Sequence, residues 1–172
     1  MKLDLACPAD LSALHALIES AYRGDSARVG WSHEADLLDG QRTDTADLEQ
    51  MLANPARQLL VLRDGDALRA CVALADKTGG LTYLGLLTVD PESQATGLGR
   101  ILLAAAEDHA VQRFAANRIE MTVIAQRDEL IAWYQRRGYA LTGERRPFPL
   151  DDPRFGLPRR NDLDFVVMER RL

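Results

Sequence analysis

Residues 84–100 read Leu84-Gly85-Leu86-Leu87-Thr88-Val89-Asp90-Pro91-Glu92-Ser93-Gln94-Ala95-Thr96-Gly97-Leu98-Gly99-Arg100. An apolar strand runs here into a loop, and the loop runs directly into a helix. The first turn of a helix leaves backbone N–H groups unpaired and carries the positive end of the helix dipole. Because Gly97 and Gly99 lack side chains, an anion can approach that backbone closely. The stretch therefore predicts a binding site for a pyrophosphate.

Two other kinds of phosphate-binding loop do not fit these residues. A Walker loop continues from its last glycine with Lys and then Ser or Thr, whereas Arg100 and Ile101 follow Gly99. A dinucleotide-binding fingerprint needs three glycines after an early strand, and only two are present, late in the chain. For an isolated Gly-x-Gly, a tight turn without a ligand stays open as the alternative.

Hydrophobic periodicity and turn residues predict the elements on either side. We expect strands at Lys2–Cys7, Gln58–Arg63, Leu68–Asp76, Leu81–Val89, Ile119–Ala125, Tyr139–Thr142 and Asp164–Glu169. We expect helices from Asp10 to Tyr22, from Thr43 to Leu52 (capped by Asp44 or Thr43), from Leu98 to Phe114 (largely buried) and from Asp128 to Arg137. The stretch Arg146–Asn161 is expected to be a loop. This order predicts one α/β domain over residues 1–172 with a mixed sheet.

Two motifs resemble those of the GNAT superfamily of N-acyltransferases. Its acyl-CoA signature, Gln/Arg-x-x-Gly-x-Gly/Ala, is similar to Gln94-Ala95-Thr96-Gly97-Leu98-Gly99, and a second family motif is similar to Ala132-Trp133-Tyr134-Gln135-Arg136-Arg137-Gly138-Tyr139. The resemblance is sharp over residues 81–142. It implies a mostly antiparallel central sheet flanked by helices, with splayed strands that form an acyl-CoA cleft. It also implies transfer of an acetyl group from acetyl-CoA to an amine, by direct attack in a ternary complex.

The resemblance assigns expected roles to individual residues. The CoA pyrophosphate is expected on Gln94, Ala95, Thr96, Gly97, Leu98, Gly99 and Arg100, and the pantetheine arm along Leu87, Thr88 and Val89. For Arg100, a phosphate contact and a solvated surface position are both open. Tyr134 is the expected general acid, because a phenol with a pKa of about 10 is protonated at neutral pH and can protonate the departing thiolate. Many family members have Asn seven residues before this tyrosine, where this chain has Arg127.

The attacking amine must lose a proton, and the base that takes it is less evident. Many relatives carry a carboxylate on the strand before the loop, but this chain has none between Leu81 and Thr88. His33 and Glu34, in the irregular segment after the first helix, are the candidate bases, with a solvated loop surface as the alternative for both. Trp31 and Phe148 are the candidate acceptor-binding residues. The identity of the acceptor stays open.

Composition limits the other classes of function. The formal net charge of −5 gives no basic face for nucleic acid and mildly favours a cationic acceptor. Cys7 and Cys71 predict two small buried apolar side chains, with no disulfide, metal centre or acyl-cysteine intermediate. The sequence shows neither a signal peptide nor a membrane span, so we expect a cytoplasmic protein. The family allows a homodimer.

One alternative function belongs to a different class. A regulatory domain that binds acyl-CoA without turnover, a sensor, would also need the glycine loop. The missing strand carboxylate favours this alternative, whereas the retained Tyr134 opposes it.

Overall fold

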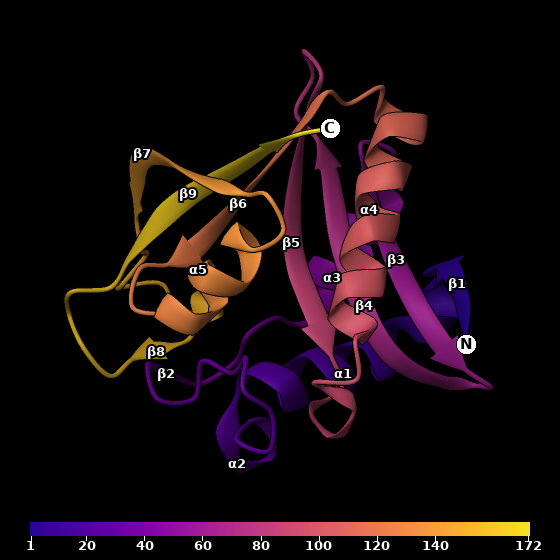
Figure 1. Cartoon of the computed structure of the whole chain (residues 1–172). Helices are drawn as coiled ribbons and strands as arrows, with labels where there is room; N and C mark the ends of the chain where they lie inside the picture. Colours follow the sequence, from indigo (N-terminus) through magenta and orange to yellow (C-terminus); the bar gives the residue numbers. More distant parts are fainter.

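The central sheet has seven strands in the order β1-β3-β4-β5-β6-β9-β7 (Figure 1). This arrangement is that of a computed structural model, which describes all 172 residues. The strands are β1 (Lys2–Leu5), β3 (Arg57–Asp64), β4 (Ala67–Asp76), β5 (Leu81–Val89), β6 (Arg118–Ile124), β7 (Ala140–Pro147) and β9 (Asp164–Arg171). Two short strands, β2 (Leu38–Asp39) and β8 (Leu157–Pro158), form a separate sheet. Only β5 and β6 are parallel neighbours, which confirms a mixed, mostly antiparallel sheet.

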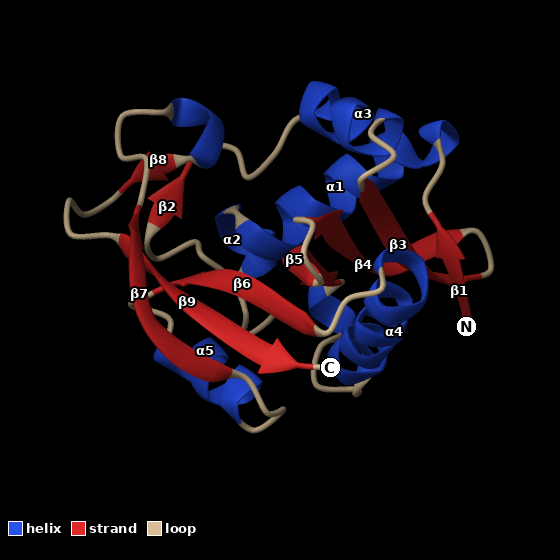
Figure 2. Cartoon of the chain, turned by 90° about the horizontal axis from the view of Figure 1, so that it is seen from above, coloured by secondary structure: helices blue, strands red, loops and turns tan.

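Helices cover both faces of the sheet. They are α1 (Leu11–Tyr22), α2 (Gly24–Ala27), α3 (Thr45–Ala53), α4 (Leu98–Phe114) and α5 (Asp128–Gln135), with 3-10 turns at Pro8–Asp10, Pro91–Ser93 and Pro153–Phe155. Successive residues of a strand point to opposite faces. Leu60 and Leu62 of β3 pack in one core with α4, whereas Leu59 and Val61 pack in another with α1 and α3. Helix α4 therefore lies on one face, and α1 and α3 lie on the opposite face (Figures 1 and 2).

Strands β5 and β6 run side by side over only a short distance. Residues 81–83 pair with residues 118–120, although β5 continues to Val89 and β6 to Ile124. Beyond Tyr83 the sheet opens like a V. Strands β1, β3, β4 and β5 form one arm, and β6, β9 and β7 form the other (Figure 2). The splayed strands expected from the sequence are thus present.

A bulge bends β5 where it borders the opening. The pairing of β4 with β5 changes register between Cys71 and Ala73. On the opposite strand Leu86 has a φ of 51°, which is uncommon for a residue with a side chain. A bulge of this kind bends its strand and redirects the side chains that follow. The end of β5 is thereby turned toward the loop that leads into α4.

Strand β7 continues from the start expected at Tyr139–Thr142 as far as Pro147. The expected loop Arg146–Asn161 therefore begins inside a strand. Strand β7 is an exposed edge strand, and edge strands often carry charges instead of alternating apolar residues. Here the Arg146 guanidinium pairs with Glu120 of β6 at 3.2 Å. The short elements α2, β2 and β8 were also not expected, since each is too short to show a period.

The structure tests several local expectations from the sequence. Asp44 is the cap of α3, because its Oδ1 accepts a hydrogen bond from the Asp47 N–H at 2.8 Å. Helix α4 buries Leu102 completely but leaves Ile101 52% exposed, so it is buried on one side only. The thiol of Cys71 is buried, whereas Cys7 is exposed, contrary to expectation.

None of the helices has the length and apolar character needed to cross a membrane.

Candidate active site

A cleft of about 690 Å³ occupies the opening between β5 and β6. Residues 83–87 of β5 and 121–124 of β6 form part of its walls. Most of the residues singled out in the sequence also line it: Trp31, Glu34, Leu87, Val89, Gln94, Ala95, Gly97, Gly99, Arg100, Tyr134 and Phe148. Four others do not: His33, Thr88, Thr96 and Leu98. The fold thus brings together segments that are far apart in the chain.

The loop before α4 has the backbone of an anion site. Ala95 and Gly97 both adopt left-handed conformations, with φ of 63° and 92°, and such turns point successive N–H groups into one concavity. No atom lies within 4 Å of the place where a Gly97 side chain would begin. Thr96 contributes to the shape, since its hydroxyl donates to the Ser93 carbonyl at 2.6 Å. The loop therefore offers an open cradle at the start of a 17-residue helix.

The side chain of Gln94 ties this loop to the segment after α2. Its Oε1 accepts hydrogen bonds from the N–H groups of Trp31 (2.9 Å) and Ser32 (3.3 Å), and its Nε2 donates to the Val89 carbonyl (3.2 Å). The backbone of Gly30 passes so close that a Cβ there would lie 2.5 Å from the Gln94 amide. The Gln94 side chain thus organises the cleft wall, while its backbone belongs to the loop.

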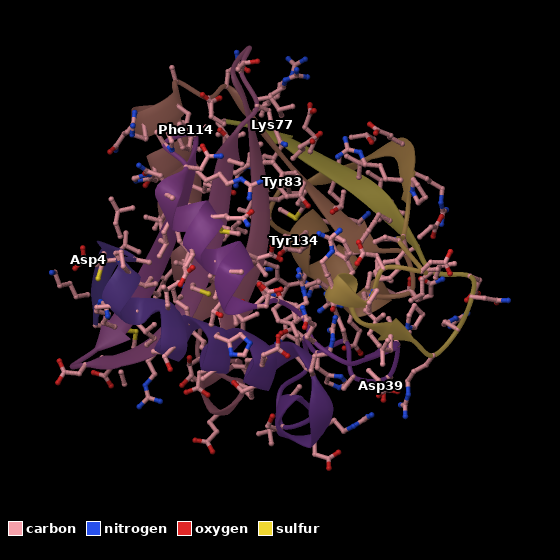
Figure 3. The ribbon with its side chains drawn as sticks, turned by 180° about the vertical axis from the view of Figure 1, so that it is seen from behind. Asp4, Asp39, Lys77, Tyr83, Phe114 and Tyr134 are labelled. Carbon is pink, nitrogen blue, oxygen red and sulfur yellow. The ribbon has the colours of Figure 1, made fainter.

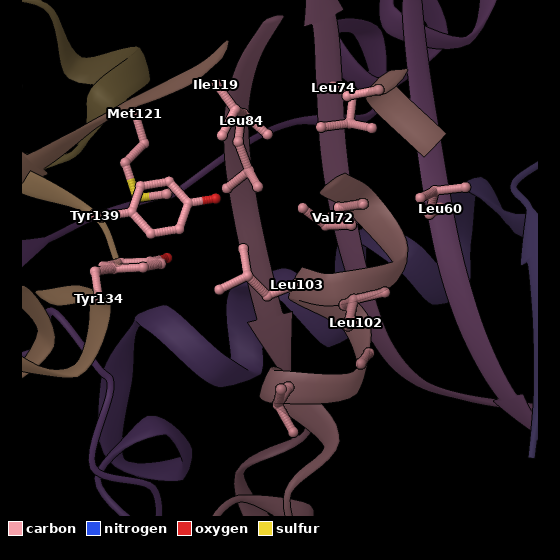
Figure 4. Close-up of a cluster of buried hydrophobic side chains, with 14 of the residues drawn as sticks. Leu60, Val72, Leu74, Leu84, Leu102, Leu103, Ile119, Met121, Tyr134 and Tyr139 are labelled. Carbon is pink, nitrogen blue, oxygen red and sulfur yellow. The ribbon is translucent and has the colours of Figure 1, made fainter. Parts of the chain in front are cut away.

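Tyr134 stands in the cleft wall with a hydroxyl that no other group of the chain engages. The other three tyrosines are hydrogen-bonded: Tyr22 to Leu87, Tyr83 to Thr122 and Tyr139 to Glu107. The Tyr134 ring packs edge-on against Trp133 and Tyr139, with centroids 5.0 and 5.6 Å away, beside Met121 (Figure 4). Burial raises its pKa above the ordinary value. The phenol therefore stays protonated and is oriented by packing alone.

Three arginines surround the carboxylate of Glu34. Arg23 donates to its Oε2 at 2.6 Å, Arg127 donates to its Oε1 at 3.0 Å, and Arg42 lies 3.7 Å away. The Glu34 and Arg23 side chains are only 7% and 6% exposed. Burial alone would raise the pKa of Glu34, but the charges of Arg127, Arg42 and Arg23 outweigh it, so the pKa is lowered.

Comparison with known proteins decides the family. The sequence model of the Acetyltransferase (GNAT) family matches residues 14–139. The chain belongs to the GNAT family of acetyltransferases. No curated protein sequence matches it significantly.

Solved structures share the complete GNAT fold of this chain at low sequence identity. The ribosomal-protein-alanine N-acetyltransferase of Brucella melitensis is 19% identical, with a TM-score of 0.73 and 100% coverage of both chains. A putative acetyltransferase of Salmonella typhimurium, solved with acetyl-CoA, is 20% identical, with a TM-score of 0.71 and coverage of 100% of this chain and 94% of that one. A spermidine N-acetyltransferase variant of Vibrio cholerae is 16% identical, with a TM-score of 0.68 and coverage of 99% and 95%.

In this GNAT chain, two carbonyls of the strand edge expected to bind pantetheine already accept hydrogen bonds. The Leu87 carbonyl accepts from the Tyr22 hydroxyl at 3.0 Å, and the Val89 carbonyl accepts from Gln94. Thr88 is 2% exposed and its hydroxyl donates to the Leu86 carbonyl. Thr88 therefore shapes the bulged strand from inside.

The two aromatic residues that the sequence suggests for acceptor binding, Trp31 and Phe148, occupy different parts of the GNAT cleft. Trp31 lies beside the loop before α4, where its N–H bonds to Gln94, and its ring centroid is 6.3 Å from that of Trp133. Phe148 is 7% exposed and packs against Phe165, at 5.2 Å between ring centroids. His33 lies outside the cleft, and its Nδ1 accepts a hydrogen bond from the Ala35 N–H at 3.2 Å.

The sequence did not single out several groups that line the GNAT cleft. Tyr22 was read only as part of the apolar face of α1, and nothing in its local pattern distinguishes it from a core residue. Arg23 and Arg42 belong to no recognisable motif in the sequence. Arg127 was noticed as a departure from the family pattern, and that departure was the one available signal for the arginine cluster around Glu34.

The lining of the GNAT cleft is strongly basic, although the whole chain carries a net charge of −5. Eight of the lining residues are basic: Arg23, Arg42, Arg57, Lys77, Arg100, Arg127, Arg137 and Arg154. Only two are acidic, Glu34 and Asp47. The negative net charge of the whole chain suggested a cationic acceptor, but the charge of the cleft lining is positive. No cluster of three or more His, Cys, Asp or Glu side chains is arranged to hold a metal ion.

Proposed function

We propose that this protein is an N-acetyltransferase that moves an acetyl group from acetyl-CoA to an amine by direct attack in a ternary complex. One observation carries the proposal: the left-handed loop at Ala95 and Gly97 and the unengaged hydroxyl of Tyr134 border the same cleft. The loop suits a diphosphate, and the phenol suits a leaving thiolate. Family membership adds support, because the fold is one that acetyltransferases use.

The residues around the loop fit coenzyme A. A diphosphate would be held by backbone N–H groups of residues 94–100 at the start of α4. Arg100 and Arg137 line the same part of the cleft and would add positive charge. Burial lowers the pKa of Arg137, and the neighbouring charges of Arg136 and Arg100 lower it further. Its Nε is buried without a hydrogen-bond partner. Like charges gathered in this way favour a polyanion.

The proposed step balances with the groups in place. The amine nitrogen forms a bond to the thioester carbonyl carbon, and the C–S bond breaks. Tyr134 gives its proton to the leaving sulfur, which departs as a thiol. The nitrogen, which attacks as a neutral amine, loses one proton after the bond forms, and this proton passes to the Tyr134 phenolate, directly or through water, so that the phenol is restored. Cys71 takes no part, because burial raises the pKa of its thiol to about 12 and it does not line the cleft.

The geometry speaks against both candidate bases. Glu34 is held by three guanidinium groups and its lowered pKa makes it a weaker proton acceptor. His33 does not reach the cleft. The basic lining offers another way to obtain a neutral amine without a base. Nearby positive charge disfavours the ammonium form of the acceptor and so lowers its pKa. The acceptor amine would then bind in its neutral, nucleophilic form without a dedicated carboxylate.

Two measurements test the proposal. Calorimetry should show coenzyme A binding to the folded wild-type protein at near-physiological salt, and release of the free thiol of CoA should follow addition of acetyl-CoA with a panel of amines. Substitution Tyr134→Phe should retain binding and lose turnover. Absence of CoA binding would overturn the proposal. Binding by the wild type without turnover of any amine would favour the sensor alternative instead.

A further inference from the structure

We infer that the acceptor amine also carries a carboxylate group, and that the guanidinium of Arg42 receives this carboxylate. The inference deepens the proposed function and rests on it. It starts from the excess of positive charge in the cleft, which the coenzyme accounts for only in part.

Five of the eight basic residues form two groups on opposite faces of the sheet. Arg100 and Arg137 lie near the beginning of α4 and at the end of α5, beside the coenzyme loop. Arg23, Arg42 and Arg127 meet at Glu34 beside Tyr22 of α1, which packs on the other face. Figure 3 views the molecule from that second side, with Tyr83 and Tyr134 labelled between the two arms of the V. A diphosphate on the α4 loop therefore does not neutralise the second group of cations, which has Glu34 as its one carboxylate in the cleft nearby.

Within the second group, the guanidinium charges exceed what Glu34 can neutralise. Arg23 and Arg127 already make short contacts to both oxygens of Glu34. Arg23 also donates to the carbonyls of Tyr22 and Phe155, and Arg127 donates to that of Ser32. These two arginines hold Glu34 in place and have few donors left.

Arg42 differs from them in having its donors free. Its guanidinium makes no hydrogen bond within the chain, since the 3.7 Å distance to Glu34 is too long for one. The group lies over the Tyr22 ring, 4.9 Å from its centroid, in a cation–π contact. Its side chain is 28% exposed and lines the cleft. The neighbouring Glu34 carboxylate helps to keep it charged.

This arrangement suits a carboxylate better than other anions or cations. A planar guanidinium with two parallel N–H groups matches a planar carboxylate and binds it through two hydrogen bonds. A polyamine would bring further positive charge next to Arg23, Arg42 and Arg127, and that repulsion opposes its binding. The expected acceptor class is therefore an amino acid, or a peptide whose free amine and carboxylate lie close together.

The preference for a carboxylate can be tested on the wild-type protein with pairs of ligands that differ only in this group. Protein saturated with CoA is titrated in a calorimeter with a panel of N-acetyl-L-amino acids and with the primary amide of each. At least one acid should bind about tenfold more tightly than its amide, as expected for a charge-assisted pair. Equal affinities of acid and amide throughout the panel, including pairs in which neither binds, would overturn the inference.

Variants then assign the effect to Arg42. Arg42→Met should reduce the affinity for the acid to that for its amide, and Arg42→Lys should restore it only in part, because lysine lacks the planar fork. Arg160→Met is the matched control, since Arg160 is exposed and pairs with Asp162 away from the cleft. An unchanged preference in Arg42→Met would refute the assignment. CoA binding and turnover of plain amines, measured in parallel, report on the proposed function separately.

Discussion

The Oε1 atom of Gln94 accepts a hydrogen bond from the backbone N–H of Trp31 at 2.9 Å, between residues 63 positions apart in the sequence. The same side chain reaches the carbonyl at the end of β5. One amide thus joins the loop before α4, the strand that precedes it and the segment that carries Trp31 and Glu34. Under the proposed function, this residue links the acceptor side of the cleft to the coenzyme side.

Removing this link should loosen the cleft. Gln94→Ala should lower the free energy of unfolding by about 1–3 kcal/mol, because it leaves partly buried backbone groups without partners. It should also raise the KM for both substrates. Gly30→Ala should cause the same changes, since a Cβ at that position would displace the Gln94 amide. Urea unfolding and steady-state kinetics would measure both effects.

The double variant provides the control for this link. If the two substitutions act on one interaction, Gln94→Ala combined with Gly30→Ala should be hardly worse than either alone. If the two losses in the free energy of unfolding were fully additive, Gly30 would act on stability through something other than the Gln94 side chain. Gln112→Ala, which truncates an exposed side chain of α4, should have little effect.

Substitution Tyr134→Phe should reduce kcat by about 10²- to 10⁴-fold, the usual range for loss of a general acid. The affinity for CoA should not change, because the lost hydroxyl makes no bond within the chain. Tyr83→Phe is the matched control, since Tyr83 also lines the cleft but its hydroxyl bonds to Thr122. A kcat that Tyr134→Phe leaves intact would remove Tyr134 from the mechanism.

The pH profile offers a second check on Tyr134. Its hydroxyl must be protonated to act, and burial raises its pKa above the ordinary value of about 10. A raised pKa moves the loss of the proton to higher pH. Ionisation of Tyr134 should therefore cause no fall in kcat below about pH 10. A descending limb at neutral pH that Tyr134→Phe abolishes would contradict this assignment.

Substitution Glu34→Gln should destabilise the protein, because it leaves buried guanidinium groups without their counter-ion. We expect a loss of about 3 kcal/mol in the free energy of unfolding near pH 7. Because the pKa of Glu34 is lowered in the folded state, its contribution is present above the unfolded pKa and disappears as pH falls through the folded one. The difference between wild type and variant should thus shrink below about pH 4.

Denaturant unfolding at several pH values measures this difference. The same variant distinguishes an organising role from a catalytic one. If Glu34→Gln left stability unchanged but abolished the alkaline rise of kcat/KM, Glu34 would be the base after all. Glu144→Gln serves as the control, since Glu144 pairs with Arg146 on the exposed edge strand and should change stability little.

The glycine loop can be tested with a geometrically matched pair. Gly97 has a φ of 92° and Gly143 a φ of 85°, and neither has an atom within 4 Å of a would-be Cβ. Both Gly97→Val and Gly143→Val should therefore cost a similar amount of stability through backbone strain. Only Gly97→Val should weaken CoA binding, by about tenfold or more, because it fills the cradle. Calorimetry that found equal CoA affinities would place the coenzyme elsewhere.

Sequence alone predicted most of the fold, since local patterns encode it. The glycine loop, the apolar strands on each side and the motif around Tyr134 were enough for the element order and the family. Strand β7 was partly missed for a physical reason. An exposed edge strand keeps its place by pairing and by ion pairs such as that of Arg146 with Glu120, and it needs no apolar alternation.

The electrostatics of the cleft were decided only by tertiary structure. Arg23, Arg42, Glu34 and Arg127 come from segments up to 104 positions apart, and each looks like a surface residue in its own segment. Folding removes them from water together, and burial makes each charge depend on its neighbours. Glu34 was named from the sequence as a candidate base, and only the folded chain shows that three guanidinium groups surround its carboxylate. Local sequence determines which elements form, whereas the charge of a cleft depends on which distant side chains meet there.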